Sequence, residues 1–423
     1  MSNLNYYVLS DLHMGYGHLQ DFTNESDLVA FLNEKREGDV VIFNGDTFDF
    51  VQTPCLKNEI IPKLSVPGHP IYGPTEEESC QKFALIVKQH RNIFDALKAC
   101  HNRGVAIHFI AGNHDADLLW PKVETDIVST INGNELSPRI TIYKEFLLSS
   151  NQGCSTDVGI FHGHQQAGPA NLFKDWDTGP FIKDKQGILH LEQPWGSRLL
   201  MCLVNKLDKD FPYIDNIKPF SRFLKVCWRT NERALAILVR LIWSHLIDIA
   251  GNPEEIMITP EDLQAVTKLG DISSIDDKTE RWIDSVLCDA QSELVAGLIG
   301  SRAFLEIIET YGSGIEATTM LKSHASSMIK SNHGKLIICG HTHEPILESL
   351  KCGVYLNTGC WIPRLKDSER YFYHWDPTIV HPGQLEFYAR ANSQYFESCL
   401  TYATFSHNSA TGLSGMPELK LWT

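Results

Sequence analysis

The sequence predicts an α/β fold with a functional site at one edge of a sheet. Strand-like runs alternate with helical patterns, which favours a layered α/β domain. Several of the runs, such as Val40 to Phe43 and Val105 to Ala111, are continuously apolar, and such runs are typical of strands covered on both faces. Turns rich in His and Asp follow these runs, and ligands of α/β sheets gather beyond the carboxyl ends of the strands.

The first part of the chain supplies most of the predicted elements. We expect strands over residues 5–9, 40–43, 105–111, 140–148 and 158–161, and helices over residues 24–37 and 75–103. Thr75 and Glu78 form a capping-box pattern at the start of the second helix, and Gly104 follows its end. Residues 52–79, which lead into the second helix, are rich in proline, and we expect a loop there that is longer than usual. We expect either a functional cover or a surface excursion there.

A mainly helical insertion interrupts the strand pattern. Residues 165–333 show helical spacing and few strand signals, and strands resume at 335–339, 354–356 and 385–388. We therefore predict a core made of residues 1–164 and 334–405, with residues 165–333 as a helical insertion or cap. Residues 406–423 are rich in Ser, Gly and Asn, and we expect a mobile tail.

Composition limits the classes of function. The 423 residues have a net charge of −15 and a pI near 5.6, which argues against a general nucleic-acid-binding surface. The 11 cysteines form no Cys-x-x-Cys pair, as expected for buried side chains in a reducing compartment. No segment resembles a signal peptide or an uncharged membrane span, so we expect a cytoplasmic protein.

Five polar turns carry the chemistry. Each follows a strand-like run, and together they offer imidazole, carboxylate and amide ligands: Asp11-Leu12-His13, Gly45-Asp46, Gly112-Asn113-His114-Asp115, His162-Gly163-His164 and Gly340-His341-Thr342-His343. Alone, an Asp-x-His or Gly-Asp turn has little predictive value. As a set, the turns predict enough ligands for two metal ions.

In these motifs the chain resembles the calcineurin-like metallophosphoesterase family. The five signatures occur in the family's order within about the first 165 residues and again after residue 335. The resemblance implies a four-layer αββα β-sandwich with a two-metal site at one edge. It implies that one metal is bound by Asp11, His13 and His343, that the other is bound by Asn113, His162 and His341, and that Asp46 bridges them.

The ligand types indicate the metals and the reaction. Mixed imidazole and carboxylate ligands suit two divalent transition-metal ions, with Mn²⁺ favoured and Fe or Zn²⁺ as alternatives. Two such ions, two carboxylates and a bridging hydroxide sum to a charge of +1, which attracts an anionic phosphoryl group. The resemblance therefore implies in-line attack of that hydroxide on a phosphate ester. We favour a phosphodiester or pyrophosphate bond in a small or lipid-linked molecule.

The resemblance also assigns catalytic residues. His114 is expected to face the substrate as an acid, with Asp115 either orienting its ring or capping the following helix. Asp49, three residues after Asp46, is a candidate supporting residue or a simple turn residue. Asn357-Thr358-Gly359-Cys360-Trp361 is similar to hydrolases of UDP-diacylglucosamine, but His114 and His164 depart from that subgroup's pattern. His164 and Trp361 are candidate substrate contacts.

A basic stripe marks the insertion. On a helical wheel of residues 219–249, the basic side chains fall within an arc of about 80°: Arg222, Lys225, Arg229, Arg233 and Arg240. The stripe is either a solvated outer face or a lid that meets an anionic substrate, an anionic lipid or nucleic acid. It keeps open a nuclease as a second enzyme hypothesis. A non-catalytic scaffold with this fold is the third hypothesis.

Overall fold

The structure is a computed structural model that describes most of the chain. The described residues are 3–54, 72–134, 136–150, 156–168, 171–194, 196–197, 200–201, 205, 314–331, 333–365 and 396–423. The central part of the Pro-rich loop, the basic stripe and the strand predicted at 385–388 lie outside these ranges. No helix of the described part is long and apolar enough to cross a membrane.

A six-stranded sheet forms the first layer of strands. Four of its strands are parallel neighbours in chain order, namely β1 (Leu4–Leu9), β2 (Asp39–Asn44), β3 (Ala106–Ile110) and β4 (Ile140–Tyr143). Beyond β1 the sheet continues antiparallel through β14 (Thr401–Asn408) and β15 (Gly412–Leu421). Because β1, β2 and β3 are parallel, the loops that follow them leave the sheet at the same edge.

A five-stranded sheet packs face to face against the first. Its parallel centre is β11 (Gly353–Thr358), β9 (Leu336–Cys339) and β6 (Thr156–Ile160), and its antiparallel edges are β10 (Pro345–Leu350) and β5 (Phe146–Ser149). The predicted strand 140–148 is thus two strands. The chain passes from the first sheet to the second between Tyr143 and Phe146.

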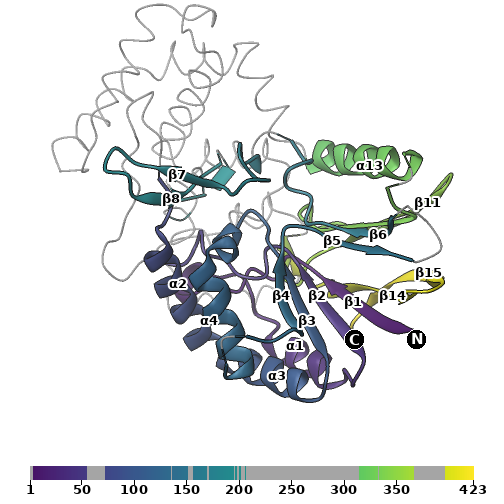
Figure 1. Cartoon of the computed structure of the whole chain (residues 1–423), viewed down its shortest axis with the longest axis horizontal. Helices are drawn as coiled ribbons and strands as arrows, with labels where there is room; N and C mark the ends of the chain where they lie inside the picture. The colour runs from purple at the N-terminus through teal and green to yellow at the C-terminus, as the bar shows by residue number, and fades with distance from the viewer. Residues whose placement is uncertain are drawn as a thin grey trace, which may run out of the picture.

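Helices cover the outer faces of both sheets (Figure 1). On the first sheet lie α1 (Glu25–Asn33), α3 (Arg91–Asn102) and α4 (Pro121–Asn132), and α2 (Glu76–Gln89) packs beside them. On the second sheet lies α13 (Gly314–Lys330). The order of layers is helix, sheet, sheet, helix, so the predicted αββα β-sandwich is confirmed.

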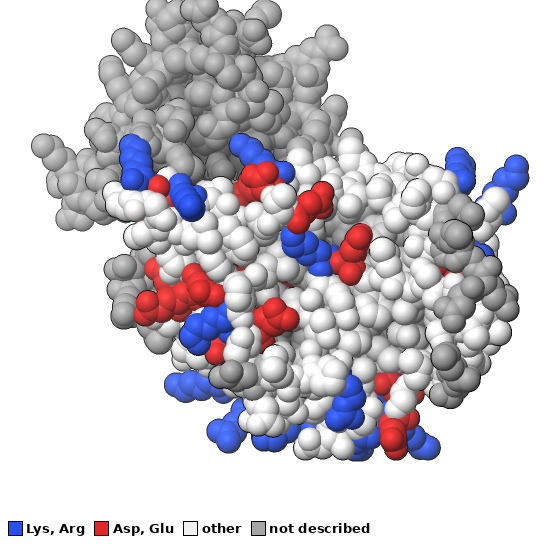
Figure 2. Space-filling model, in the orientation of Figure 1, with Lys and Arg blue, Asp and Glu red and all other residues white. Residues whose placement is uncertain are grey.

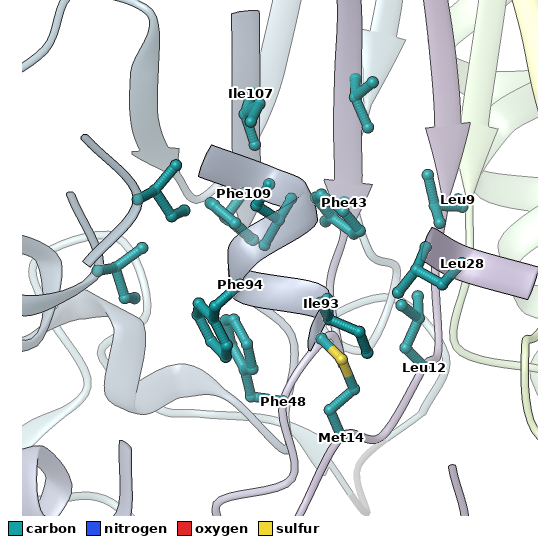
Figure 3. Close-up of a cluster of buried hydrophobic side chains, with 14 of the residues drawn as sticks. Leu9, Leu12, Met14, Leu28, Phe43, Phe48, Ile93, Phe94, Ile107 and Phe109 are labelled. Carbon is teal, nitrogen blue, oxygen red and sulfur yellow. The ribbon is translucent and has the colours of Figure 1, made fainter. Parts of the chain in front are cut away.

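Three apolar layers hold this sandwich together. Between the sheets, Val8 and Ile42 of the first pack with Ile160 and Ile338 of the second. Under the first sheet's helices lies an aromatic-rich core (Figure 3), where Phe43 and Phe109 stack with ring centroids 5.0 Å apart. Under α13 lies a smaller core. The loops that leave the carboxyl ends of β1, β2 and β3 are therefore anchored on a rigid base.

Short elements lie at the edges of this frame. The 3-10 helix η1 (Gly17–Leu19) follows the first metal-ligand turn, and η2 (Ala116–Leu119) precedes α4. Two small hairpins are formed by β7 (Phe181–Lys183) with β8 (Leu189–Leu191), and by β12 (Arg364–Leu365) with β13 (Phe396–Glu397). The first hairpin lies in the segment predicted to be mainly helical.

The capping box at Thr75 is confirmed, but the predicted helix 75–103 is two helices. Thr75 Oγ1 accepts the Glu78 N–H, and the Glu78 carboxylate accepts the Thr75 N–H at 2.8 Å. The backbone leaves the helical region at His90, with φ −108° and ψ 38°. The buried His90 ring contacts the Gly15 carbonyl oxygen at 3.0 Å through Nε2, which ties this bend to the loop after β1.

The prediction of a mobile tail is wrong. Residues 412–421 form β15, which pairs with β14 and completes the first sheet. Trp422 packs near the side chain of Lys35, whose Nζ lies over the rings of Phe31 and Tyr7 at 4.0 and 4.2 Å. The Ser and Gly residues serve the turn and the exposed face of an edge strand. Helix α13, predicted as insertion, packs on β9 and β11.

Candidate metal centre

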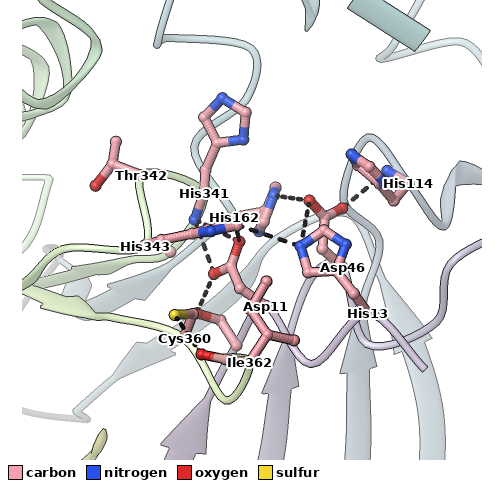
Figure 4. Close-up of polar contacts among 12 residues, drawn as sticks. Asp11, His13, Asp46, His114, His162, His341, Thr342, His343, Cys360 and Ile362 are labelled. Atoms are coloured by element: carbon pink, nitrogen blue, oxygen red, sulfur yellow. Dashed lines mark hydrogen bonds and ion pairs between the residues drawn. The ribbon is translucent and has the colours of Figure 1, made fainter. Parts of the chain in front are cut away.

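All seven predicted metal ligands lie on loops that follow strands at one edge of the sandwich. Figure 4 shows all of them except Asn113 as labelled side chains. Asp11 and His13 follow β1, Asp46 follows β2 and Asn113 follows β3. The other ligands follow strands of the second sheet: His162 follows β6, and His341 and His343 follow β9. The two sheets thus present their ligands toward each other across the gap between the layers.

The ligand backbones are strained. Within the described part of the chain, the non-glycine residues with positive φ are all predicted ligands: Asp11 (54°), His13 (51°), Asp46 (49°), His341 (71°) and His343 (61°). A left-handed residue with a Cβ costs about 1–2 kcal/mol, and such residues persist only where the surroundings fix them. This strain marks the edge as a functional site rather than a set of ordinary turns.

The ligand atoms form two adjoining groups. Asp11, His13 and His343 form one group and Asp46, His162 and His341 form the other, with the ligand atoms of each group within 4.8 Å of one another. In the first, His343 Nε2 lies 3.2 Å from Asp11 Oδ1. In the second, His162 Nε2 lies 3.1 Å from Asp46 Oδ2.

Asp46 also reaches the first group. Its Oδ2 atom is 4.0 Å from His13 Nε2, and Asp46 forms a third group with His13 and His114. This position between two candidate ligand groups fits the bridging role that the resemblance implies for Asp46.

The residues fit a pair of transition-metal ions. The Nε2 atoms of His13 and His343 face each other at 3.3 Å, an arrangement that a cation between imidazoles stabilises. The Oδ1 atom of Asn113 is buried without a hydrogen-bond partner, although such a buried acceptor normally has one. The imidazole, carboxylate and amide donors suit Mn²⁺, Fe or Zn²⁺ better than an oxygen-only ion such as Mg²⁺.

Two glycines permit the close approach of these turns. A Cβ on Gly112 would overlap the Asp46 carboxylate and lie 2.6 Å from the Asp46 backbone nitrogen. A Cβ on Gly340 would lie 2.6 Å from Ser10 Oγ and 2.7 Å from Asp11 Oδ2. Any side chain here would push a carboxylate ligand away, which explains glycine beside Asn113 and His341.

The role predicted for Asp115 as the partner of His114 is wrong. The Asp115 carboxylate accepts backbone N–H groups from Gly112 at 2.6 Å, Thr47 at 2.8 Å, and Asp46 and Phe48 at 3.2 Å. It therefore holds the turns after β2 and β3 together. Burial and the Asp46 charge raise the pKa of Asp115 to about 7, while the backbone donors oppose this rise.

Asp49 is the partner of His114. Its Oδ2 atom lies 3.0 Å from Nδ1 of His114 and 3.3 Å from Nδ1 of His13. Asp49 is fully buried, and its Oδ1 accepts the Gln52 N–H at 2.8 Å. Burial opposes its ionisation, but His114 and His13 outweigh burial and hold the pKa of Asp49 below its usual range.

Buried charges of opposite sign stabilise each other in the metal-binding cluster. Burial raises the pKa of Asp11, but His343 and His162 outweigh it and hold this pKa below its usual range. Burial also raises the pKa of Asp46, but the neighbouring His162 outweighs burial and holds this pKa well below its usual range. Burial lowers the pKa of His162, but Asp46 and Asp11 raise it to about 9. A metal that binds His162 must therefore displace a proton.

Supporting residues that the sequence analysis did not assign lie behind the ligands. Ser10 Oγ donates to the Asp11 carboxylate and lies 2.6 Å from Thr358 Oγ1. Asn357 Nδ2 donates to the Gly340 carbonyl oxygen at 2.7 Å and to Thr342 Oγ1 at 3.1 Å. Asn357 and Thr358 belong to the Asn-Thr-Gly motif, so the sequence contains a signal for them, although the motif by itself indicates only a subgroup resemblance.

The predicted substrate contacts have different outcomes. Trp361 is fully buried, and its ring nitrogen donates to the Thr401 carbonyl oxygen at 2.8 Å, so it belongs to the core and its prediction as a substrate contact is wrong. His164 is buried against Trp176, with ring centroids 4.5 Å apart. Arg222, Lys225, Arg229 and Arg233 lie outside the described residues.

Comparison with known families agrees with this site. The family model described as calcineurin-like phosphoesterase matches residues 4–211, which carry the ligands from Asp11 to His162. The other two predicted ligands, His341 and His343, lie beyond this match and belong to the candidate ligand groups. The chain is a calcineurin-like metallophosphoesterase, and thus a metal-dependent phosphoric ester hydrolase. None of the curated proteins compared with the chain matches it.

Three solved structures are similar to the chain at low identity. A predicted phosphoesterase from Streptococcus pneumoniae TIGR4 aligns at 8% identity over 100% of this chain and 99% of its own, with a TM-score of 0.24. Phosphopantetheinyl hydrolase from Mycobacterium tuberculosis aligns at 9% identity over 85% of this chain and 90% of its own, with a TM-score of 0.26. A putative 5'-nucleotidase from Staphylococcus aureus aligns at 13% identity over 100% of this chain and 54% of its own, with a TM-score of 0.30.

Proposed function

We propose that this site hydrolyses a phosphodiester or pyrophosphate bond in a small or lipid-linked molecule, with two Mn²⁺ ions as its metals. The observation that carries the proposal is the Asp49–His114 contact at 3.0 Å beside the ligand Asp46. It adds a fixed proton donor to the metal site. Alkoxide leaving groups need such a donor more than acidic phenols do.

The ligands have distinct tasks. Asp11, His13 and His343 would hold one ion, Asn113, His162 and His341 would hold the other, and Asp46 would lie between them as a shared ligand. When bound, the two ions withdraw charge from the phosphoryl oxygens and lower the pKa of a bound water. The turns hold the ligand side chains in place before the substrate arrives, because their backbones are fixed by hydrogen bonds within the protein.

His114 is the residue that we assign to the leaving group. Its backbone N–H donates to Asp46 Oδ1 at 2.8 Å, which holds the residue beside the bridging ligand. Asp49 fixes Nδ1, so we assign Nε2 to the leaving oxygen. A general acid needs a proton on that nitrogen, and the Asp49 carboxylate is the acceptor that faces the other nitrogen of the ring.

Charge favours a small anionic substrate over a nucleic acid. Two divalent ions with the carboxylates Asp11 and Asp46 leave a local charge of +2, which attracts phosphate. On the face shown in Figure 2, the described Lys and Arg residues are mixed with Asp and Glu and form no continuous basic surface. The whole chain carries −15, and a nuclease normally needs an extended basic surface.

A substrate panel with defined metals tests this proposal. The metal-free protein is loaded with Mn²⁺ and tested on aryl phosphate mono- and diesters, dinucleotides, nucleotide sugars, and single- and double-stranded nucleic acids. Faster turnover of diesters or pyrophosphates than of monoesters supports the proposal. Preferred, salt-sensitive cleavage of nucleic acid would establish the nuclease instead. If the protein bound no metal and hydrolysed none of these substrates, the hypothesis of a non-catalytic scaffold would remain.

A further inference from the structure

A side chain outside the five motif turns contacts a metal ligand. Asn171 Nδ2 lies 3.3 Å from Nε2 of His341. Asn171 belongs to the segment that follows the His162 turn and precedes β7. It is half-buried.

The segment that carries Asn171 is held by several contacts. Phe173 is buried and packs with Ala116 and Leu191. The Lys174 N–H donates to the Glu192 carboxylate at 3.0 Å. Lys144, at the crossing between the two sheets, donates to the Asp177 carbonyl oxygen at 2.8 Å. The chain that follows Asn171 is therefore fixed against η2 and β8, and this limits where Asn171 can lie relative to His341.

The backbone of His341 is fixed, but the backbone alone does not set the angle of its ring. Its N–H donates to the Asp11 carboxylate at 2.9 Å, and the next N–H, of Thr342, donates to the Gly340 carbonyl oxygen at 2.8 Å. The ring projects away from Asp11 and His343 (Figure 4). A ligand imidazole usually gains its orientation and tautomer from a hydrogen bond at its other nitrogen.

We propose that Asn171 is a positioning residue for His341, fixing the ring so that Nδ1 faces the second metal. The inference rests on the proposed two-metal site. Coordination through Nδ1 leaves the ring proton on Nε2, which must then donate. Rotation of the Asn171 amide by about half a turn places Oδ1 where Nδ2 lies, and Oδ1 can then accept the hydrogen bond from Nε2. The segment after β6 thereby sets the affinity of the second metal.

Paired variants test the acceptor at Asn171. Asn171→Leu keeps the volume and removes both polar atoms, and Asn171→Ala makes the same deletion with a smaller side chain. Asn171→Asp keeps an acceptor and serves as the rescue variant. The matched control is Asn132→Leu, because Asn132 Oδ1 contacts His101 Nε2 at 3.0 Å between α3 and α4, in an equivalent Asn–His pair remote from the metal centre.

Mn²⁺ binding to the metal-free full-length proteins is measured by calorimetry and by the electron paramagnetic resonance signal of the bound ions, with circular dichroism to verify folding. We expect Asn171→Leu and Asn171→Ala to lower the affinity for one of the two Mn²⁺ ions about ten- to a hundredfold. Both variants should also reduce the signal of the coupled ion pair. Asn171→Asp should restore both. The control should match the unchanged protein.

Two results would overturn the proposal. One is binding of both Mn²⁺ equivalents by Asn171→Ala and Asn171→Leu with unchanged affinity. The other is a loss in Asn171→Asp equal to that in Asn171→Leu, because an acceptor at this position would then have no effect. If the unchanged protein bound fewer than two equivalents, the proposed two-metal function itself would fail, and this inference would fail with it.

Discussion

The two sheets contribute different halves of the metal centre. The first sheet supplies every oxygen ligand, namely Asp11, Asp46 and Asn113, together with His13. The second sheet supplies only the imidazoles of His162, His341 and His343. In the proposed site, the first half would carry the negative charge that neutralises the metals, and the second half would supply neutral ligands.

The halves also differ in how their backbones are fixed. In the first half, the N–H groups of Leu12 and His13 both donate to the Asp46 carbonyl oxygen at 2.9 Å. The Asp115 carboxylate adds three bonds to the turn after β2 and one within its own turn. In the second half, the Gly340 N–H donates to the His162 carbonyl oxygen at 2.9 Å, and the side chains of Asp11 and Asn357 supply the other bonds to the turn at His341. We therefore expect the first half to determine whether a site forms and the second half to tune its affinity.

Asp46→Asn should have the largest effect on activity. The variant loses the bridging charge in the first half, and several kcal/mol of transition-state stabilisation correspond to a loss of about 10³-fold or more in kcat. Steady-state kinetics with metal analysis checks this, and circular dichroism checks the fold. Retention of both metals and of more than a tenth of kcat would contradict the role of Asp46.

Asp115→Ala should have the largest effect on stability. Four backbone donors lose a buried acceptor, so we expect the free energy of unfolding to fall by about 3 kcal/mol, measured by urea denaturation. Asp126→Ala is the control, because its pair with the exposed Lys122 on α4 contributes less than about 1 kcal/mol. Equal effects of the two substitutions would show that Asp115 does not hold the first half together.

His114→Ala should lower kcat about a hundredfold and leave both metals bound. The loss should be larger for an alkyl than for a nitrophenyl leaving group, because only the alkoxide needs a proton. Comparing kcat across leaving groups measures this dependence, and Asp49→Asn should show the same trend more weakly. A loss that is independent of the leaving group would rule out His114 as the acid.

His343→Gln tests the second half and should have the smallest effect on activity. Loss of one neutral ligand should lower the affinity for one Mn²⁺ ion by about tenfold or more, since even the loss of a residue that supports a ligand has this effect. Excess Mn²⁺ should restore most of the activity, as shown by kinetics at increasing metal concentration. The same rescue of Asp46→Asn would remove the distinction between the halves.

The sequence predicted which residues gather at the site better than which residues support them. Turns after buried strands must meet at one edge of a sheet, so Asp11, Asp46 and His162 could be grouped from strand order and family motifs. The direction of a side chain within a turn has no such rule. For this reason Asp115 was assigned to His114, although Asp115 turns back to the backbone and Asp49 makes the contact.

Other misses came from tertiary packing. Composition indicated a mobile tail, but a strand next to β14 gains its stability from pairing, which local sequence does not report. Trp361 lies in a motif, but its ring fills the core beside Phe31, with centroids 5.5 Å apart. Helix α13 was grouped with the insertion because its period matched, whereas its contacts with β9 and β11 place it on the second sheet.

The measurement that tests the central claim most directly is a Mn²⁺ titration of the metal-free protein beside Asp46→Asn. Calorimetry gives the number of ions, and electron paramagnetic resonance reports whether they are coupled. The bridging position of Asp46 predicts two Mn²⁺ per chain with a coupled signal in the unchanged protein, and loss of the coupled pair in Asp46→Asn. One ion or none in the unchanged protein, or the same coupled pair in both proteins, would contradict the account.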